Sequence, residues 1–245
     1  MQKSEIRENV QDWQSLMFLY NSAIRVVRTK LDIINDELNL IYQYSPIEYI
    51  KSRIKTPESI VKKLKRLGHD TTIQNMVDYV NDIAGIRVVC SFATDIYRLA
   101  DMIGGQQEFS ILYIKDYIKH PKPSGYRSYH MHLLVPIQTS GGVIPTKVEI
   151  QIRTIAMDFW ASLEHQIHYK FEGEAPNYIS HDLQVCAQIV ANLDDKMVSL
   201  HEEMRKAEKK QKDLQVLSAA VSQAAESTQS PQGTGGTSFP DKVTA

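Results

Sequence analysis

Polar side chains gather on one face of a predicted strand, Lys147 to Arg153. Because side chains along a strand alternate between its two faces, Glu149, Gln151 and Arg153 share one face, and the valine and isoleucines between them share the other. The aliphatic face is typical of a strand that covers a core. The polar face either meets solvent, as one side of an antiparallel sheet commonly does, or lines a cleft.

A second predicted strand, Tyr129 to Ile137, separates its residues in the same way. His130 and His132 lie on one face, and the hydrophobic residues that alternate with them lie on the other. Two strands that each carry a stripe of ionisable groups favour the cleft over a solvated surface. We therefore expect the two polar stripes to line one site.

The loop that precedes this second strand, His120 to Ser128, is rich in cations, aromatic rings, Pro and Gly. Lys122 and Arg127 can neutralise phosphates, and Tyr126 offers a ring on which a base can stack. Gly125 allows the backbone to turn or to approach a ligand closely. This composition suits a flat, anionic ligand, and the alternative is a basic surface turn.

A carboxylate and a guanidinium stand at the start of another predicted strand, where Asp82 is followed by Arg87. Together with Glu149, Asp82 would hold Mg²⁺, which prefers one or two carboxylates plus substrate phosphates. The alternative for Asp82 is an ordinary turn-forming or capping role. Upstream lies a basic cluster that alternatively forms a solvated helix face: Arg53, Lys55, Lys62, Lys63, Lys65 and Arg66.

The elements that must position these residues are predicted from residue patterns. Strands are expected at Ile86 to Phe92, Ile111 to Ile118, Tyr129 to Ile137 and Lys147 to Arg153. Helices are expected at Val10 to Ile41, Ser59 to Leu67 with its start at Thr56-Pro57-Glu58, Thr94 to Ile103, Ile155 to Lys170 and about Ser180 to Leu217. Residues 1–44 thus form an N-terminal helical region, 45–175 a catalytic core and 176–217 a C-terminal helix.

The two ends of the chain differ in character. Hydrophobic residues recur every three or four positions from Val10 to Ile41, which predicts a helix that packs on the protein's own sheet or, alternatively, forms an oligomer contact. The segment 218–245 lacks the apolar side chains that offset ordering entropy, so we expect a disordered tail.

Composition excludes several classes of protein. The 28 basic and 29 acidic residues give a formal net charge of −1, so no overall positive field favours DNA or an anionic membrane. Cys90 and Cys186 belong to no CxxC pair, which argues against a zinc cluster or a disulfide framework. No apolar run approaches the roughly 18 residues of a membrane span, so the expected location is the cytoplasm.

Taken in order, four motifs resemble the synthetase domain of the RelA/SpoT superfamily, and within it the small alarmone synthetases. They are Arg53-Ile54-Lys55, Asp82-Ile83-Ala84-Gly85-Ile86-Arg87, Gly125-Tyr126-Arg127-Ser128-Tyr129-His130 and Glu149-Ile150-Gln151-Ile152-Arg153-Thr154. The resemblance runs from about Ser45 to Lys170, and the continuation Ala156 to His165 is similar to the small, single-domain branch.

This resemblance implies a nucleotidyltransferase-like α/β fold, a mixed sheet flanked by helices, and assembly as a homotetramer. It also implies that the chain transfers pyrophosphate from ATP to the 3′-hydroxyl of GTP or GDP. The ATP-binding residues would be Arg53, Lys55, Ser59 and Arg87. Those for GTP would be Lys115, Lys122, Tyr126, Arg127, His130 and Glu164.

For the reacting centre, the resemblance implies Mg²⁺ held by Asp82 and Glu149. Glu149 would also polarise the attacking hydroxyl, with Gln151 orienting it. One alternative is a catalytically silent regulator that binds nucleotides or RNA, which would need damage to the metal carboxylates. Another is a metal-dependent hydrolase built on His165 and His168 with His130 and His132, although no HExxH motif is present.

Overall fold

The computed structural model describes residues 2–170 and 176–228. The chain divides into two compact units, Met1–Val198 and Ser199–Ala245. Along the first unit, helices and strands follow one another as α1 (Gln2–Tyr42), β1 (Ile47–Ile54), α2 (Pro57–Leu67), α3 (Ile73–Tyr79), β2 (Ala84–Cys90), α4 (Ala93–Gly104), β3 (Ser110–Asp116), β4 (Tyr129–Thr139), β5 (Gly142–Thr154) and α5 (Ile155–Lys170). The last helix, α6 (Asn177–Thr228), begins in the first unit and continues into the second.

A five-stranded mixed sheet is the centre of the first unit, with the order β1-β2-β5-β4-β3. The β2–β5 pair is parallel and the other pairs are antiparallel. This mixed sheet with flanking helices confirms the predicted fold class. The structure adds β1 and α3 to the predicted elements. β1 is an edge strand whose Lys51, Ser52 and Arg53 are exposed, so its sequence lacks the alternation of a half-buried strand.

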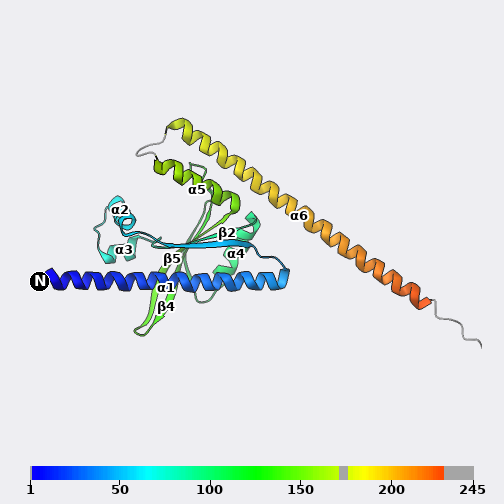
Figure 1. The fold of residues 1–245 in the computed structure, drawn as a ribbon, viewed down its shortest axis with the longest axis horizontal. Coiled ribbons are helices and arrows are strands. Elements are labelled where there is room, and N and C mark those ends of the chain that lie inside the picture. Colours follow the sequence, from blue (N-terminus) through cyan, green and yellow to red (C-terminus); the bar gives the residue numbers. More distant parts are fainter. Residues whose placement is uncertain (1, 171–175, 229–245) are drawn as a thin grey trace, which may run out of the picture. The chain divides into compact units, whose positions relative to one another are not determined.

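The apolar face of the sheet is covered by α1 and α4. In Figure 1, α1 lies across the β4–β5 hairpin, and it contacts the central strands. Its side chains Tyr20, Val27, Leu31, Ile34 and Leu38 are buried in the same core as the aliphatic residues of β2, β4 and β5. The hydrophobic stripe predicted for this helix therefore packs on the protein's own sheet.

A smaller apolar cluster joins α5 to the first part of α6. Trp160 and Ala161 pack against Leu183 and Ala187, and the Trp160 indole N–H donates to the Leu183 carbonyl at 3.0 Å. At the end of β5, the Thr154 hydroxyl donates to Asp194 Oδ2 at 2.8 Å. These contacts fix the start of α6 beside the sheet.

The later part of α6 corrects the predicted start of the tail. Residues 218–228 are helical, where we expected disorder from Ser218 onward. Alanine, the strongest helix former, occupies 219, 220, 224 and 225, which favours continuation of the helix. The rest of the predicted tail, 229–245, lies outside the described residues. Among those described, no helix is both long and apolar enough to cross a membrane.

Candidate active site

The polar stripes of β4 and β5 lie side by side on the face of the sheet opposite α1. Antiparallel pairing sets His130 opposite Gln151 and His132 opposite Glu149, while parallel pairing sets Gly85 of β2 beside Glu149. His130, His132 and Glu149 are all buried. The stripes thus line a site, as the sequence predicted, and do not form a solvated surface.

A cavity of about 560 Å³ opens over this face. Its lining brings together both predicted metal carboxylates, Asp82 and Glu149, with residues predicted to bind each nucleotide. The ionisable and aromatic members of the lining are Arg53, Asp82, Arg87, Lys122, Tyr126, His130, Glu149, Arg153, Glu164 and His165. Segments from β1 to α5 therefore converge on one concave, strongly polar site.

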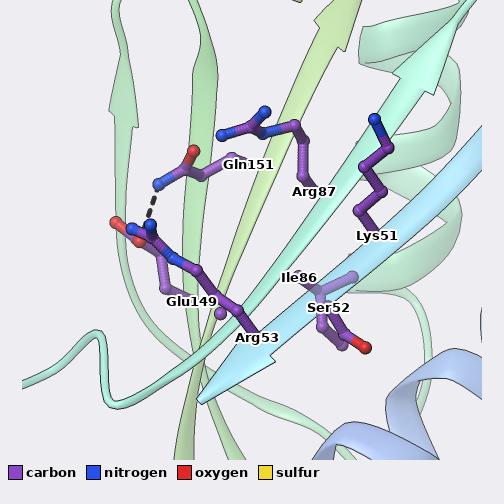
Figure 2. Close-up of a pocket in the computed structure, with 8 residues that line it drawn as sticks. Lys51, Ser52, Arg53, Ile86, Arg87, Glu149 and Gln151 are labelled. Atoms are coloured by element: carbon purple, nitrogen blue, oxygen red, sulfur yellow. Dashed lines mark hydrogen bonds between the residues drawn. The ribbon is translucent and has the colours of Figure 1, made fainter. Parts of the chain in front are cut away.

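Two smaller cavities extend this site along β1 and α2. One, of about 250 Å³, shares Arg53, Arg87, Glu149 and Gln151 with the main cavity. Figure 2 shows Arg53 of β1 and Arg87 of β2 extending toward Glu149 and Gln151. The other, of about 210 Å³, joins Asp82 to a basic group made of Lys55, Ser59, Lys62, Lys63 and Arg66. Both are suited to polyanions.

Asp82 is held between two ammonium groups. Lys55 Nζ lies 2.8 Å from Oδ2 and Lys63 Nζ lies 2.7 Å from Oδ1. Burial raises the pKa of Asp82, but the hydrogen bonds and charges of the two lysines outweigh this and hold the pKa below its ordinary value. Lys63 was assigned only to a basic cluster from the sequence, because its pairing joins α2 to a loop nineteen residues later.

Glu149 is held by three neighbours. His130 Nδ1 and His132 Nε2 lie 3.1 and 3.4 Å from Oε1, and Gln151 Nε2 donates to Oε2 at 2.8 Å. Burial raises the pKa of the Glu149 carboxyl, but the hydrogen bonds from His130 and Gln151, with the charges of both histidines, bring its pKa below the ordinary value. Glu149 is therefore an ionised, oriented carboxylate at neutral pH.

Tyr126 and Lys122 come from the loop before β4, as predicted. The Tyr126 hydroxyl accepts from Arg153 Nη2 at 2.6 Å and lies 2.9 Å from His130 Nε2. Lys122 Nζ lies 4.7 Å from the centre of the Tyr126 ring. Burial and the charge of Lys115 lower the pKa of Lys122. An anion in the cavity would relieve this crowding of positive charge.

Asp158 of α5 joins two arginines and was not among the predicted substrate-binding residues. Its Oδ1 lies 2.9 Å from Arg153 Nη1 and 3.1 Å from Arg87 Nη1. Its Oδ2 accepts from the Tyr49 hydroxyl at 2.9 Å. This buried carboxylate fixes both guanidinium groups at the edge of the cavity. Arg153 also lines the cavity, although it was not predicted to bind a ligand.

Three predicted GTP residues differ in where they lie. Glu164 of α5 lines the cavity, whereas Lys115 is exposed on β3, paired in register with His130. Neither Lys115 nor Arg127 is among the residues that line the cavity, so their roles in binding GTP stay predictions. The Nη2 of Arg127 donates to the Ile118 carbonyl at 3.2 Å, because successive residues in extended backbone point to opposite sides and Tyr126 takes the side of the cavity.

The hydrolase alternative finds no support in the described residues. Their one grouping of His, Cys, Asp or Glu with metal-ligand spacing is His130, His132 and Glu149, and His165 is not part of it. The side chain of His168 lies outside the description.

Comparison with known proteins places this site in a family. The model of the region found in RelA/SpoT proteins matches residues 52–174. GTP pyrophosphokinase YwaC of Bacillus subtilis (strain 168) is 42% identical over 200 residues, covering 82% of this chain and 95% of that protein.

Comparison with solved structures points to the same family. Small alarmone synthetase 2 from Bacillus subtilis superposes with a TM-score of 0.72 at 42% identity, over 78% of this chain and 99% of that one. Small alarmone synthetase 1 from the same species, bound to its product pppGpp, gives a TM-score of 0.72 at 35% identity, over 78% and 97%. With a family match across half of its length and a relative matched almost throughout, this chain belongs to the RelA/SpoT family and, within it, to the small alarmone synthetases.

Proposed function

We propose that this chain is a GTP pyrophosphokinase, which transfers the β,γ-pyrophosphate of ATP to the 3′-hydroxyl of GTP or GDP. The 3′-oxygen attacks the β-phosphorus, the bond between that phosphorus and the α,β-bridging oxygen breaks, and AMP leaves. The products are pppGpp or ppGpp and AMP, with the hydroxyl proton released. One observation carries the proposal: two ionised carboxylates and cations from β1, β2 and the loop before β4 line a single cavity.

ATP fits the side of the cavity formed by β1, β2 and α2. Arg53 and Arg87 offer guanidinium planes that can stack on adenine or pair with phosphates. Lys55 and Ser59 line the adjoining basic cavity, where the polyphosphate would extend. Because Asp158 already orients Arg87, this arginine is positioned before ATP arrives.

The acceptor fits the opposite side, near the loop before β4. Tyr126 supplies a ring for guanine, and Lys122 and His130 supply positive charge or hydrogen bonds for its phosphates. Lys115, which pairs in register with His130, would add positive charge beside them. Glu164 on α5 lines the same side and can accept hydrogen bonds from guanine N–H groups. Two nucleotides held this way meet near Glu149, which lies between them on β5.

The donor set at this meeting point fits Mg²⁺. Asp82 and Glu149 are hard oxygen ligands whose pKa values lie below their ordinary values, so both are ionised at neutral pH. Bound there, Mg²⁺ would neutralise charge on the ATP phosphates. Lys55 and Lys63, which now pair with Asp82, would turn toward those phosphates.

Positioning and charge neutralisation are the main contributions that this chain's residues make to phosphoryl transfer. Glu149 can accept a hydrogen bond from the 3′-hydroxyl and so polarise it, although its low pKa makes it a weak base. Gln151 fixes the orientation of Glu149 through the 2.8 Å hydrogen bond. The silent-regulator alternative needs loss of Asp82 or Glu149, and both stand in the cavity.

Incubation with ATP, Mg²⁺ and either GTP or GDP, followed by nucleotide chromatography, tests the function. A guanosine penta- or tetraphosphate peak with an equal amount of AMP is expected. ADP or free phosphate without these products would contradict it. We further propose, from family resemblance, that the active enzyme is a cytoplasmic homotetramer.

A further inference from the structure

His132 has no role in the proposed transfer, yet it is buried beside the central carboxylate. Its Nε2 lies 3.4 Å from Glu149 Oε1, and His130 Nδ1 lies 3.1 Å from the same oxygen. The ligand atoms of the three residues all lie within 4.8 Å of one another. Two imidazoles and a carboxylate thus converge on one point.

Two of the three ligand separations match a tetrahedral metal centre, and the third, between the two imidazoles, is within 4.8 Å. With bonds of about 2.0 to 2.2 Å to nitrogen and oxygen, neighbouring ligand atoms around Zn²⁺ are separated by about 3.3 Å. The two separations of 3.1 and 3.4 Å agree with such an edge. Because the three residues are carried on the paired strands β4 and β5, their backbone positions are fixed by the sheet.

Neighbouring side chains hold each of the three residues in its orientation. The Tyr126 hydroxyl lies 2.9 Å from the second nitrogen of His130, and Gln151 donates to the second oxygen of Glu149. The His132 ring stacks on Tyr113, with centroids 4.1 Å apart. Such outer partners are what fix tautomer and direction in metal sites.

His132 is left with an unsatisfied nitrogen. Its Nδ1 is buried and meets no partner at hydrogen-bonding geometry in the described chain. With a cation bound to Nε2, the ring proton of His132 would lie on this Nδ1 nitrogen.

We propose that His130, His132 and Glu149 form a binding site for a divalent transition metal ion of the Zn²⁺ class. Two histidines and a glutamate are a ligand set that Zn²⁺ accepts with a fourth position open, whereas Mg²⁺ prefers oxygen donors. His130 and Glu149 also line the main cavity, so the open position faces the substrates. Bound metal therefore withdraws both residues from the nucleotides and stops synthesis. This inhibitory part rests on the proposed function, whereas metal binding does not.

Metal binding is measured first, without any activity. The purified full-length chain is dialysed against Zn²⁺ in the presence of excess Mg²⁺, and bound zinc is determined by elemental analysis and by competition with a chromophoric chelator. One tightly bound Zn²⁺ per chain is expected. Co²⁺, added as a spectroscopic probe, should give visible ligand-field bands that Zn²⁺ abolishes.

Variants locate the site. His132→Gln and Glu149→Gln each remove one ligand and should weaken Zn²⁺ binding at least tenfold, with circular dichroism verifying the fold. His165→Gln is the matched control, because His165 lines the same cavity but lies outside the triad. It should bind Zn²⁺ as the wild type does. If His132→Gln does not fold, the Zn²⁺ affinity of Glu149→Gln tests the site in its place.

Inhibition is measured on protein loaded with one equivalent of Zn²⁺ and freed of excess metal. With Mg²⁺ present in every assay, the initial rate should fall at least tenfold relative to zinc-free protein, and a chelator selective for Zn²⁺ should restore it. In His132→Gln, the ratio of the zinc-loaded to the zinc-free rate should approach one. Wild-type protein without stoichiometric zinc, or variants that bind it unchanged, would overturn the site. Zinc bound at the triad without loss of rate would overturn inhibition alone, and absence of synthesis by zinc-free wild type with Mg²⁺ present would refute only the proposed function.

Discussion

Glu149 is oriented before any substrate binds, since both of its oxygens already have partners from β4 and β5. The same strands supply His130 and Gln151, so the chemistry of the site depends on a few side chains fixed by strand register. Function at this scale is best tested by changing one group while its neighbours stay in place.

Glu149→Gln keeps the size of the side chain but removes the charge that we propose holds Mg²⁺ and polarises the attacking hydroxyl. We expect kcat to fall by roughly 10² to 10⁴, the range associated with loss of a positioned catalytic group. Glu164→Gln makes the same chemical change at the rim of the cavity and is the control. Initial rates at saturating substrates measure both, and equal effects in the two variants would contradict the assignment.

Tyr126 combines a ring with a hydroxyl that contacts Arg153 and His130. Tyr126→Ala removes a stacking platform worth about 1 to 3 kcal/mol per base, so the KM for GTP should rise roughly 5- to 150-fold while the KM for ATP stays near wild type. Tyr126→Phe keeps the ring and isolates the hydroxyl, so its effect on the KM for GTP should be smaller. If Tyr126→Ala raised the KM for ATP and left the KM for GTP unchanged, our assignment of the two nucleotide sites would be wrong.

At the scale of elements, the sequence predicted those strands whose polar and apolar residues alternate. The alternation in β4 and β5 placed His130, His132 and Glu149 correctly, and Thr56 and Gly68 marked the ends of α2. Pairings across distant segments were not predictable, because Lys63 with Asp82, and Asp158 with Arg87, depend on tertiary packing. The edge strand β1 was missed because few of its residues are buried.

The loop before β4 packs closely against α6 at Gly125. This residue has a φ of +89°, and a Cβ added there would lie 2.5 Å from Ala187 Cβ. Gly125→Ala should therefore destabilise the fold by about 1 to 2 kcal/mol through its backbone, with a further penalty of about 1 to 3 kcal/mol through crowding. Adding Ala187→Gly relieves only the crowding. Urea unfolding of both single variants and the double variant measures the coupling, and strictly additive effects would refute the contact.

Asp194 ties α6 to β5 through Thr154. Burial raises its carboxyl pKa, and this outweighs the opposing effects of Thr154 and Arg127. The folded state therefore holds the proton more tightly than the unfolded state, so the stability contributed by this group is present at low pH and is lost as pH rises above the ordinary value of about 3.9.

From acid toward neutral pH, the wild type should lose stability relative to Asp194→Asn. Urea unfolding at a series of pH values measures this difference. Asp182→Asn, at an exposed position of the same helix that does not act on the pKa of Asp194, is the control. A difference that grows in favour of the wild type as pH rises would show that the charged carboxylate is stabilised in the fold.

At the scale of the whole molecule, all residues that line the three cavities of the site belong to the first unit. The second unit carries the later part of α6, whose side chains from Glu202 to Val216 are exposed. The central part of the α1 stripe, from Tyr20 to Leu38, is buried against the sheet, so this part is not available as the oligomer contact that the sequence also permitted. The proposed tetramer would therefore use other surfaces.

Two truncations separate turnover from assembly. Deletion of Ser218 to Ala245 removes no cavity residue, so turnover should remain within about twofold of wild type, and light scattering should still report the proposed tetramer. Deletion of Ser199 to Ala245 removes the whole second unit and should also spare the geometry of the cavity. If this longer deletion yields a smaller species with normal turnover, the exposed part of α6 provides a contact between copies, and assembly is dispensable for catalysis. A large loss of turnover in the shorter deletion would instead show that residues after 217 support the active site, contrary to their lack of buried side chains among residues 218–220.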